Sequence, residues 1–262
     1  MHLGLVTYNL AKDWDFDTCL AKCAALGYEG IEFRTTHAHG VEPTLTAAER
    51  KVLRAKAEAS PVKLVGLGST CEFHSTDPAE VQKNIQLAKD FVDLAADLGV
   101  LGVKVRPNGL PEGVPVEKTL KQIGESLKPL GDYGAKKGVM IYVECHGRGT
   151  AFPPYMATIF GTANHPNVGA CWNCNPQDIV NGSIKEYFTL IRPWMRTIHI
   201  HELSKDYPWQ ELFELLVATK FDGYTLLEEG NGNADPERIL TLNKTIWDLR
   251  LAQASSRGCC CK

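Results

Sequence analysis

The 262-residue sequence lacks the marks of several protein classes. No apolar run reaches the roughly 18 residues of a transmembrane helix, and Met1 leads almost directly into an expected strand, where we see no signal peptide. The net charge is −3 and the positive residues are dispersed, whereas a nucleic-acid-binding surface needs them concentrated. We therefore expect a cytoplasmic protein that binds neither membranes nor nucleic acid.

Two familiar motif classes are missing as well. Nine cysteines are present, but they form only one C-x-x-C pair, Cys171 to Cys174, so no zinc-ribbon spacing occurs. A redox role for that pair would need a thioredoxin-like fold, which the other patterns do not favour. Free buried thiols in a reducing compartment are the simplest interpretation. The first strand-to-helix turn also lacks the G-x-G-x-x-G of a dinucleotide-binding fold.

Apolar residues make up 44% of the chain, and strand-like and helix-like segments alternate eight times. The expected strands are 3–7, 30–33, 63–68, 102–105, 139–144, 168–172, 197–201 and 224–228. Helix signals lie between them; Asp77 and Pro78, for example, begin a helix that Gly99 ends. Eight such units predict an α/β protein with a single (β/α)₈ TIM barrel over residues 1–252 and a short mobile C-terminal tail at 253–262. A doubly wound open sheet is the alternative.

Polar residues stand where four consecutive expected strands end. In a barrel, chemistry takes place at this rim, and a charge at the end of a buried strand is costly unless it is paired or coordinated. The four residues are Glu144, Asn173, His199 and Glu228. Oxygen-rich ligation with one imidazole suits manganese, magnesium, cobalt or zinc, so we predict one divalent metal ion, with Mn²⁺ favoured. The alternative is that loop hydrogen bonds satisfy each residue separately, which is harder to accept for four strands together.

Four short motifs occur in the order and spacing of a known family. They are Gly27-Tyr28-Glu29-Gly30-Ile31-Glu32, Glu144-Cys145-His146-Gly147, His199-Ile200-His201-Glu202 and Gly223-Tyr224-Thr225-Leu226-Leu227-Glu228. With these motifs the sequence resembles the xylose isomerase-like TIM barrel superfamily, and within it the sugar phosphate isomerase/epimerase group that includes D-tagatose 3-epimerase. The resemblance implies a xylose isomerase-like barrel with Glu144, His199 and Glu228 as metal ligands.

One motif departs from that group. The group usually carries D-x-x-H after the sixth strand, and this chain reads Asn173-Cys174-Asn175-Pro176. Asparagine can still ligate a cation through its carbonyl oxygen but brings no charge, so we expect metal binding to persist in weakened form. The contact of the usual histidine is lost at Pro176. The departure bears on the reaction more than on the fold.

The resemblance implies a metal-stabilised enediolate, with Glu144 and Glu228 as the acid/base pair of a sugar isomerase or epimerase. A metal-dependent lyase or glycoside-cleaving enzyme acting on 3-keto sugars is an alternative, and so is a non-catalytic sugar-binding barrel. We expect a small carbohydrate as partner, and self-association into a homo-oligomer stays open. Candidates for holding substrate hydroxyls, each of which could instead form a salt bridge or cap a loop, are Glu32, His74, Arg106, His146, Arg148 and His201.

Overall fold

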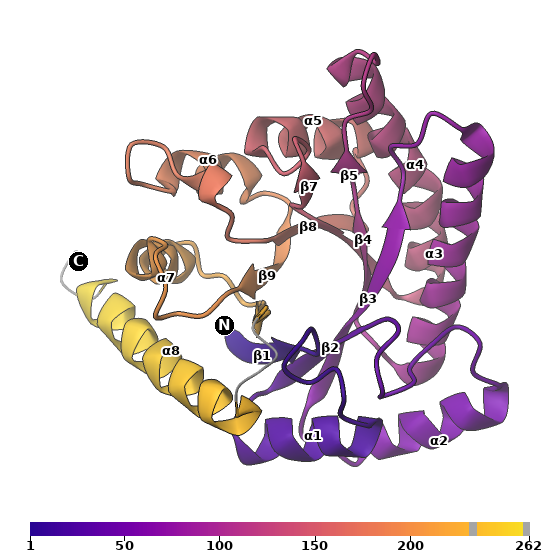
Figure 1. Ribbon diagram of the computed structural model, residues 1–262. Coiled ribbons are helices and arrows are strands. Elements are labelled where there is room, and N and C mark those ends of the chain that lie inside the picture. Colours follow the sequence, from indigo (N-terminus) through magenta and orange to yellow (C-terminus); the bar gives the residue numbers. More distant parts are fainter. Residues whose placement is uncertain (231–234, 259–262) are drawn as a thin grey trace.

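The computed structural model describes residues 1–230 and 235–258, and in this part of the chain eight parallel strands close into a barrel (Figure 1). Their order around the barrel is β1-β10-β9-β8-β6-β4-β3-β2. The strands are β1 (His2–Val6), β2 (Gly30–Arg34), β3 (Lys63–Glu72), β4 (Gly102–Arg106), β6 (Met140–Glu144), β8 (Val168–Trp172), β9 (Met195–Ile200) and β10 (Tyr224–Leu227). The predicted (β/α)₈ barrel is confirmed, and the open sheet is excluded because β1 pairs with both β2 and β10.

Helices follow the barrel strands and surround them (Figure 1). They are α1 (Phe16–Ala25), α2 (Ala47–Glu58), α3 (Pro78–Leu98), α4 (Val116–Lys137), α5 (Pro153–Ala163), α6 (Lys185–Ile191), α7 (Trp209–Ala218) and α8 (Pro236–Gly258), with a short 3₁₀ helix η1 (Pro176–Asp178). Local signals set their ends. In α3 the Asp77 side chain accepts a hydrogen bond from the Ala79 N–H, and Gly99 ends the helix with a left-handed φ of 73°.

The last helix is longer than the sequence indicated. The predicted barrel boundary lies at residue 252, but α8 continues to Gly258, and Ala254 on its inner face is only 2% exposed. Apolar burial thus extends the helix into the segment expected to be a mobile tail. The rest of that segment, 259–262 with its three cysteines, lies outside the described residues. None of the described helices is long and apolar enough to span a membrane.

Strand β3 also runs further than expected, to Glu72 rather than to Gly68. Gly68 reads as a strand end in the sequence, but the structure gives it another role. A Cβ atom at Gly68 would lie 2.8 Å from Glu32 Oε1, and one at Gly66 would lie 2.9 Å from Glu32 Oε2. These glycines therefore leave room inside the barrel for a buried carboxylate.

A second, two-stranded sheet at the barrel mouth was not predicted. It pairs β5 (Asn108–Gly109) with β7 (Gly147–Arg148) in parallel. Both strands are only two residues long, too short to leave a periodic signal in the sequence. The sheet ties the loop after β4 to the loop after β6, next to the predicted metal site.

The core lies between the barrel wall and the surrounding helices, with Phe33, Trp172 and Phe213 among its largest buried side chains. The cysteines of the described chain are buried and free, as predicted for a protein without disulfides: Cys19, Cys23, Cys71, Cys145, Cys171 and Cys174. Burial raises the pKa of the Cys71 thiol to about 11, so this thiol is protonated and unreactive at neutral pH.

Candidate active site

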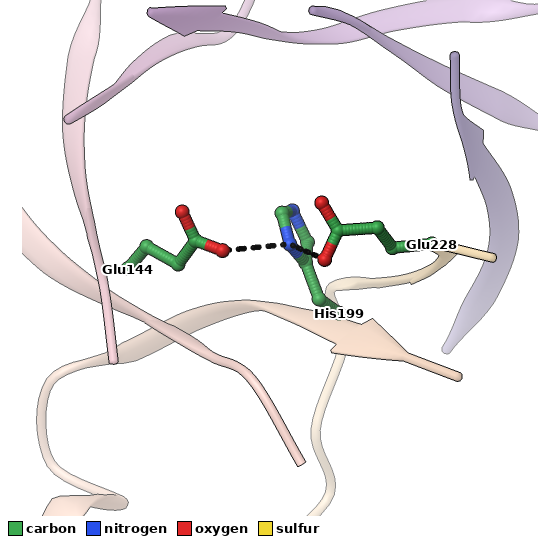
Figure 2. Close-up of side chains that lie close together, drawn as sticks. All are labelled: Glu144, His199 and Glu228. Atoms are coloured by element: carbon green, nitrogen blue, oxygen red, sulfur yellow. Dashed lines mark ion pairs between the residues drawn. The ribbon is translucent and has the colours of Figure 1, made fainter. Parts of the chain in front are cut away.

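Three of the four predicted metal ligands meet at the C-terminal mouth of the barrel (Figure 2). Glu144 ends β6, His199 lies in β9, and Glu228 follows β10 directly. His199 Nδ1 is 3.5 Å from Glu144 Oε1 and 3.4 Å from Glu228 Oε2, so the two carboxylates reach the imidazole from different sides. One ligand atom from each residue lies within 4.8 Å of the others, a spacing that a single cation can bridge after small side-chain adjustments.

Asn173, the fourth predicted ligand, directly follows β8 and lines the same cavity as Glu144 and Glu228. Its side chain is nearly buried, and its Oδ1 atom makes no hydrogen bond within the described residues; the same holds for His199 Nδ1. A buried carbonyl oxygen without a partner is costly, and within the described chain His199 Nδ1 has only the two carboxylates at ion-pair distance. A cation would satisfy both atoms, so this donor set fits a divalent metal ion.

Glu32 holds the other face of the histidine. His199 Nε2 lies 3.2 Å from Glu32 Oε2, and both side chains are fully buried. A carboxylate behind a ligating imidazole fixes the ring and keeps the opposite nitrogen directed at the metal. Glu32 is predicted from the sequence to hold substrate, but the structure places it behind His199, and it is not among the residues that line the cavity.

Lys104 is a site residue that sequence reasoning missed. It lies inside β4, with Nζ 2.6 Å from Glu144 Oε2 and 3.9 Å from Glu32 Oε1. Burial would lower the pKa of Lys104, but the two carboxylates outweigh it and raise the pKa above the ordinary value, which keeps the ammonium charged. A signal was available, since a lysine between two valines of a buried strand needs a carboxylate partner.

The charges of the site depend on one another. Burial would raise the pKa of Glu144, but Lys104 and His199 hold it well below its usual range. Burial would likewise lower the pKa of His199, yet its neighbours Cys171, Glu32 and Glu228 raise it well above the ordinary value. The carboxylate is therefore ionised at neutral pH, and a proton competes with a metal ion for the imidazole.

A cavity of about 280 Å³ opens over this group. Its lining residues are Tyr8, Arg34, Lys104, Arg106, Glu144, His146, Asn173, Asn175, His201 and Glu228. Three predicted substrate-binding residues, Arg106, His146 and His201, are thus brought together. His74 instead lines a separate cavity beside Glu72, and Arg148 lies exposed on β7.

Two of these histidines have defined partners. His146 Nδ1 lies 2.8 Å from Asn108 Oδ1, and the Asn108 amide donates to Glu72. Because Asn108 Oδ1 must accept, His146 Nδ1 donates, which leaves Nε2 as an acceptor. Burial lowers the pKa of His146, so the ring is neutral. His201 contacts the backbone carbonyl oxygens of Glu228 at 3.0 Å and Asn173 at 3.2 Å.

The barrel topology agrees with a comparison of the sequence with known families. The profile of the xylose isomerase-like TIM barrel family matches residues 20–242. The chain belongs to this family. Membership confirms the resemblance found in the short motifs. A search of curated proteins finds no match to the sequence.

Several solved structures superpose on nearly the whole chain. One is the IolI protein with a binding zinc atom, with 16% identity, a TM-score of 0.83 and coverage of 97% of this chain and 99% of that one. A second is D-psicose 3-epimerase of Clostridium cellulolyticum H10 with D-tagatose, with 16% identity, a TM-score of 0.82 and coverage of 96% of this chain and 99% of that one. A third is the probable 3-DHS dehydratase AsbF of Bacillus anthracis, with 15% identity, a TM-score of 0.75 and coverage of 95% of this chain and 99% of that one. At these identities the likeness shows the shared fold.

Proposed function

We propose that this protein is a divalent-metal-dependent sugar isomerase or epimerase, with Glu144, Asn173, His199 and Glu228 as metal ligands. The observation that carries the proposal is the meeting of these side chains around two buried atoms, Asn173 Oδ1 and His199 Nδ1, that make no hydrogen bond. The similar folds of D-psicose 3-epimerase and zinc-containing IolI support it. Mn²⁺ is the ion we favour, with Mg²⁺, Co²⁺ and Zn²⁺ as alternatives.

A divalent ion bound there would polarise a substrate carbonyl and stabilise negative charge on the neighbouring oxygen. The chain itself supplies the groups that move protons. Glu144 and Glu228 flank His199 (Figure 2), and both have pKa values lowered against the effect of burial, so both are ionised at neutral pH. One carboxylate removes the proton beside the carbonyl and keeps it. The other, after it has taken up a proton from solvent, returns that proton to the opposite face.

The place where the proton returns decides the product. Return to the same carbon from the other face gives an epimer, and return to the neighbouring carbon gives an isomer. Lys104 keeps Glu144 ionised and holds one of its oxygens, Oε2, which leaves Oε1 towards His199. His146, with Nε2 free to accept, then contributes to holding substrate hydroxyls, while His201, whose ring nitrogens face backbone carbonyl oxygens, shapes the cavity wall.

The test is proton exchange in D₂O. Purified protein loaded with Mn²⁺ is incubated with a panel of ketoses and 3-keto sugars, and incorporation of deuterium at substrate carbon is followed by NMR and mass spectrometry. Glu144→Gln and Glu228→Gln should each lower exchange by roughly a hundredfold or more. Glu125→Gln, on the surface beside Lys128, is the matched control. Absence of exchange with every substrate in the presence of bound metal contradicts the proposal.

A lyase or glycoside-cleaving reaction on a 3-keto sugar remains the second candidate. Two observations favour it: Pro176 stands where the epimerase group has histidine, and neutral His146 lines the cavity with Nε2 able to exchange a proton. Release of water or an aglycone identifies this reaction, whereas formation of isomers alone excludes it. The third reading, a non-catalytic sugar-binding barrel, is rejected if elemental analysis finds about one equivalent of bound metal.

A further inference from the structure

Arg34 is a positive residue of the cavity that the reaction above does not use. It ends β2 and lines the cavity, where its guanidinium lies 5.4 Å from the centre of the Tyr8 ring. Within the described residues the guanidinium makes one hydrogen bond, from Nη1 to the Thr35 carbonyl oxygen at 3.2 Å, and no carboxylate lies within ion-pair distance of it. The remaining N–H groups of the Arg34 guanidinium are available to a ligand.

Arg106 adds a second guanidinium to the same cavity. It ends β4, and its Nη2 donates to Glu72 Oε1 at 2.6 Å. Its Nε is buried and has no acceptor within the described chain. One ion pair therefore holds Arg106 in place without satisfying the whole guanidinium.

The charges around the cavity leave the positive charge of Arg34 unbalanced. The buried centre holds three carboxylates, those of Glu144, Glu228 and Glu32, and one ammonium group, that of Lys104, whereas the fourth proposed ligand, Asn173, carries no charge. A divalent ion would cancel the two negative charges that Lys104 leaves unbalanced. Arg34 would then face a ligand with no negative group to balance it, and a neutral sugar would desolvate its charge without a partner.

The geometry points to recognition of an oxyanion carried by the substrate. We propose that Arg34 and Arg106 bind this oxyanion, so that the protein acts on an anionic ketose rather than a neutral one. Guanidinium forks match the paired oxygens of a carboxylate or a phosphate. The cavity of about 280 Å³ lies at the small end for ligand sites, which suits one sugar acid or sugar phosphate. This inference rests on the proposed function for its keto-sugar chemistry.

Three ligands with the same carbon skeleton test the inference: D-fructose, D-fructuronate and D-fructose 6-phosphate. Binding to the Mn²⁺-loaded protein is measured by isothermal titration calorimetry, and C–H exchange is followed in parallel. At least one anion should bind roughly tenfold or more tightly than fructose, since charge-assisted hydrogen bonds dominate the difference. The anion that binds more tightly shows whether the oxyanion of the substrate is a carboxylate or a phosphate.

Variants assign the effect to the arginines. Arg34→Gln, which breaks no ion pair, should abolish the preference for the anion, while Arg34→Lys should retain part of it. Arg106→Gln should act in the same way, with circular dichroism as a check on its fold. Arg238→Gln, exposed on α8, is the matched control and should bind like the wild type.

The two proposals fail separately. Equal affinity for fructose and both anions, or an anion preference that survives Arg34→Gln, overturns the inference even if exchange on neutral ketoses supports the proposed function. Arginine-dependent binding of an anion without any C–H exchange keeps the inference and contradicts the proposed reaction.

Discussion

Replacing Lys104 by methionine is the most direct test of how the barrel mouth is held together. Lys104 Nζ lies 2.6 Å from Glu144 Oε2 in a fully buried setting, with Glu32 Oε1 at 3.9 Å. Methionine keeps most of the apolar stem and removes only the charge. Two buried carboxylates then lose their internal cation, and breaking such a pair costs about 3–5 kcal/mol. For a chain of this size that loss corresponds to a fall in Tm of roughly 6 to 20 °C.

The same variant should respond more strongly to metal. A divalent ion at Glu144 replaces part of the lost positive charge, and Lys104 no longer repels it. Saturating Mn²⁺ should therefore raise the Tm of Lys104→Met by more than that of the wild type. Differential scanning fluorimetry with EDTA and with Mn²⁺ measures both quantities.

Lys83→Met is the matched control, because Lys83 is exposed on α3 and its only described ion pair is a surface contact with Glu80. Its Tm should hardly change, with or without Mn²⁺. A Lys104→Met protein as stable as the wild type in EDTA would refute the reasoning, and so would an equal response of the two proteins to metal.

Three further predictions concern the same centre. Asn173→Asp adds a negative ligand and should tighten Mn²⁺ binding on the order of tenfold, measured by competition with a chelator; unchanged affinity would argue that Asn173 does not ligate. Metal affinity should rise with pH across the neutral range, because the raised pKa of His199 leaves a proton for the metal to displace. Calorimetry in buffers of different ionisation enthalpy measures the release of this proton. A metal affinity that does not change with pH would contradict the prediction. Gly68→Ala places a Cβ 2.8 Å from Glu32 Oε1 and should lower the free energy of unfolding, measured by urea titration, by about 1–3 kcal/mol. The control is Gly161→Ala, whose new Cβ meets no neighbouring group within 4 Å and should not destabilise the protein. Equal effects of the two substitutions would contradict the packing argument.

The sequence predicts which side chains meet at the rim better than it predicts what surrounds them, for a physical reason. Glu144, His199 and Glu228 interrupt or end apolar strands, and parallel strands bring such positions to one rim whatever the loops do. Lys104 escaped attention because it lies within a strand rather than at its end. Its importance becomes visible only when β4 is placed between β3 and β6, next to Glu144.

The positions of the residues proposed to hold substrate are harder to predict. Glu32 ends up behind the histidine because Gly66 and Gly68 of the neighbouring strand leave it space, and no local pattern expresses that fit between strands. His74 lies on the loop after β3 and faces a different cavity. Positions on loops depend on how each loop folds back over the rim, which side-chain periodicity does not encode.

The β5–β7 pair gives the entrance of the barrel one stiff side. Asn108 and Gly147 pair across it, and a Cβ on Gly147 would lie 2.5 Å from the Asn108 Cα, so the two loops fit together without slack. Each loop therefore braces the other, and neither can swing outward alone. On that side the entrance therefore keeps the same shape for every ligand, and a molecule that does not fit this shape is excluded.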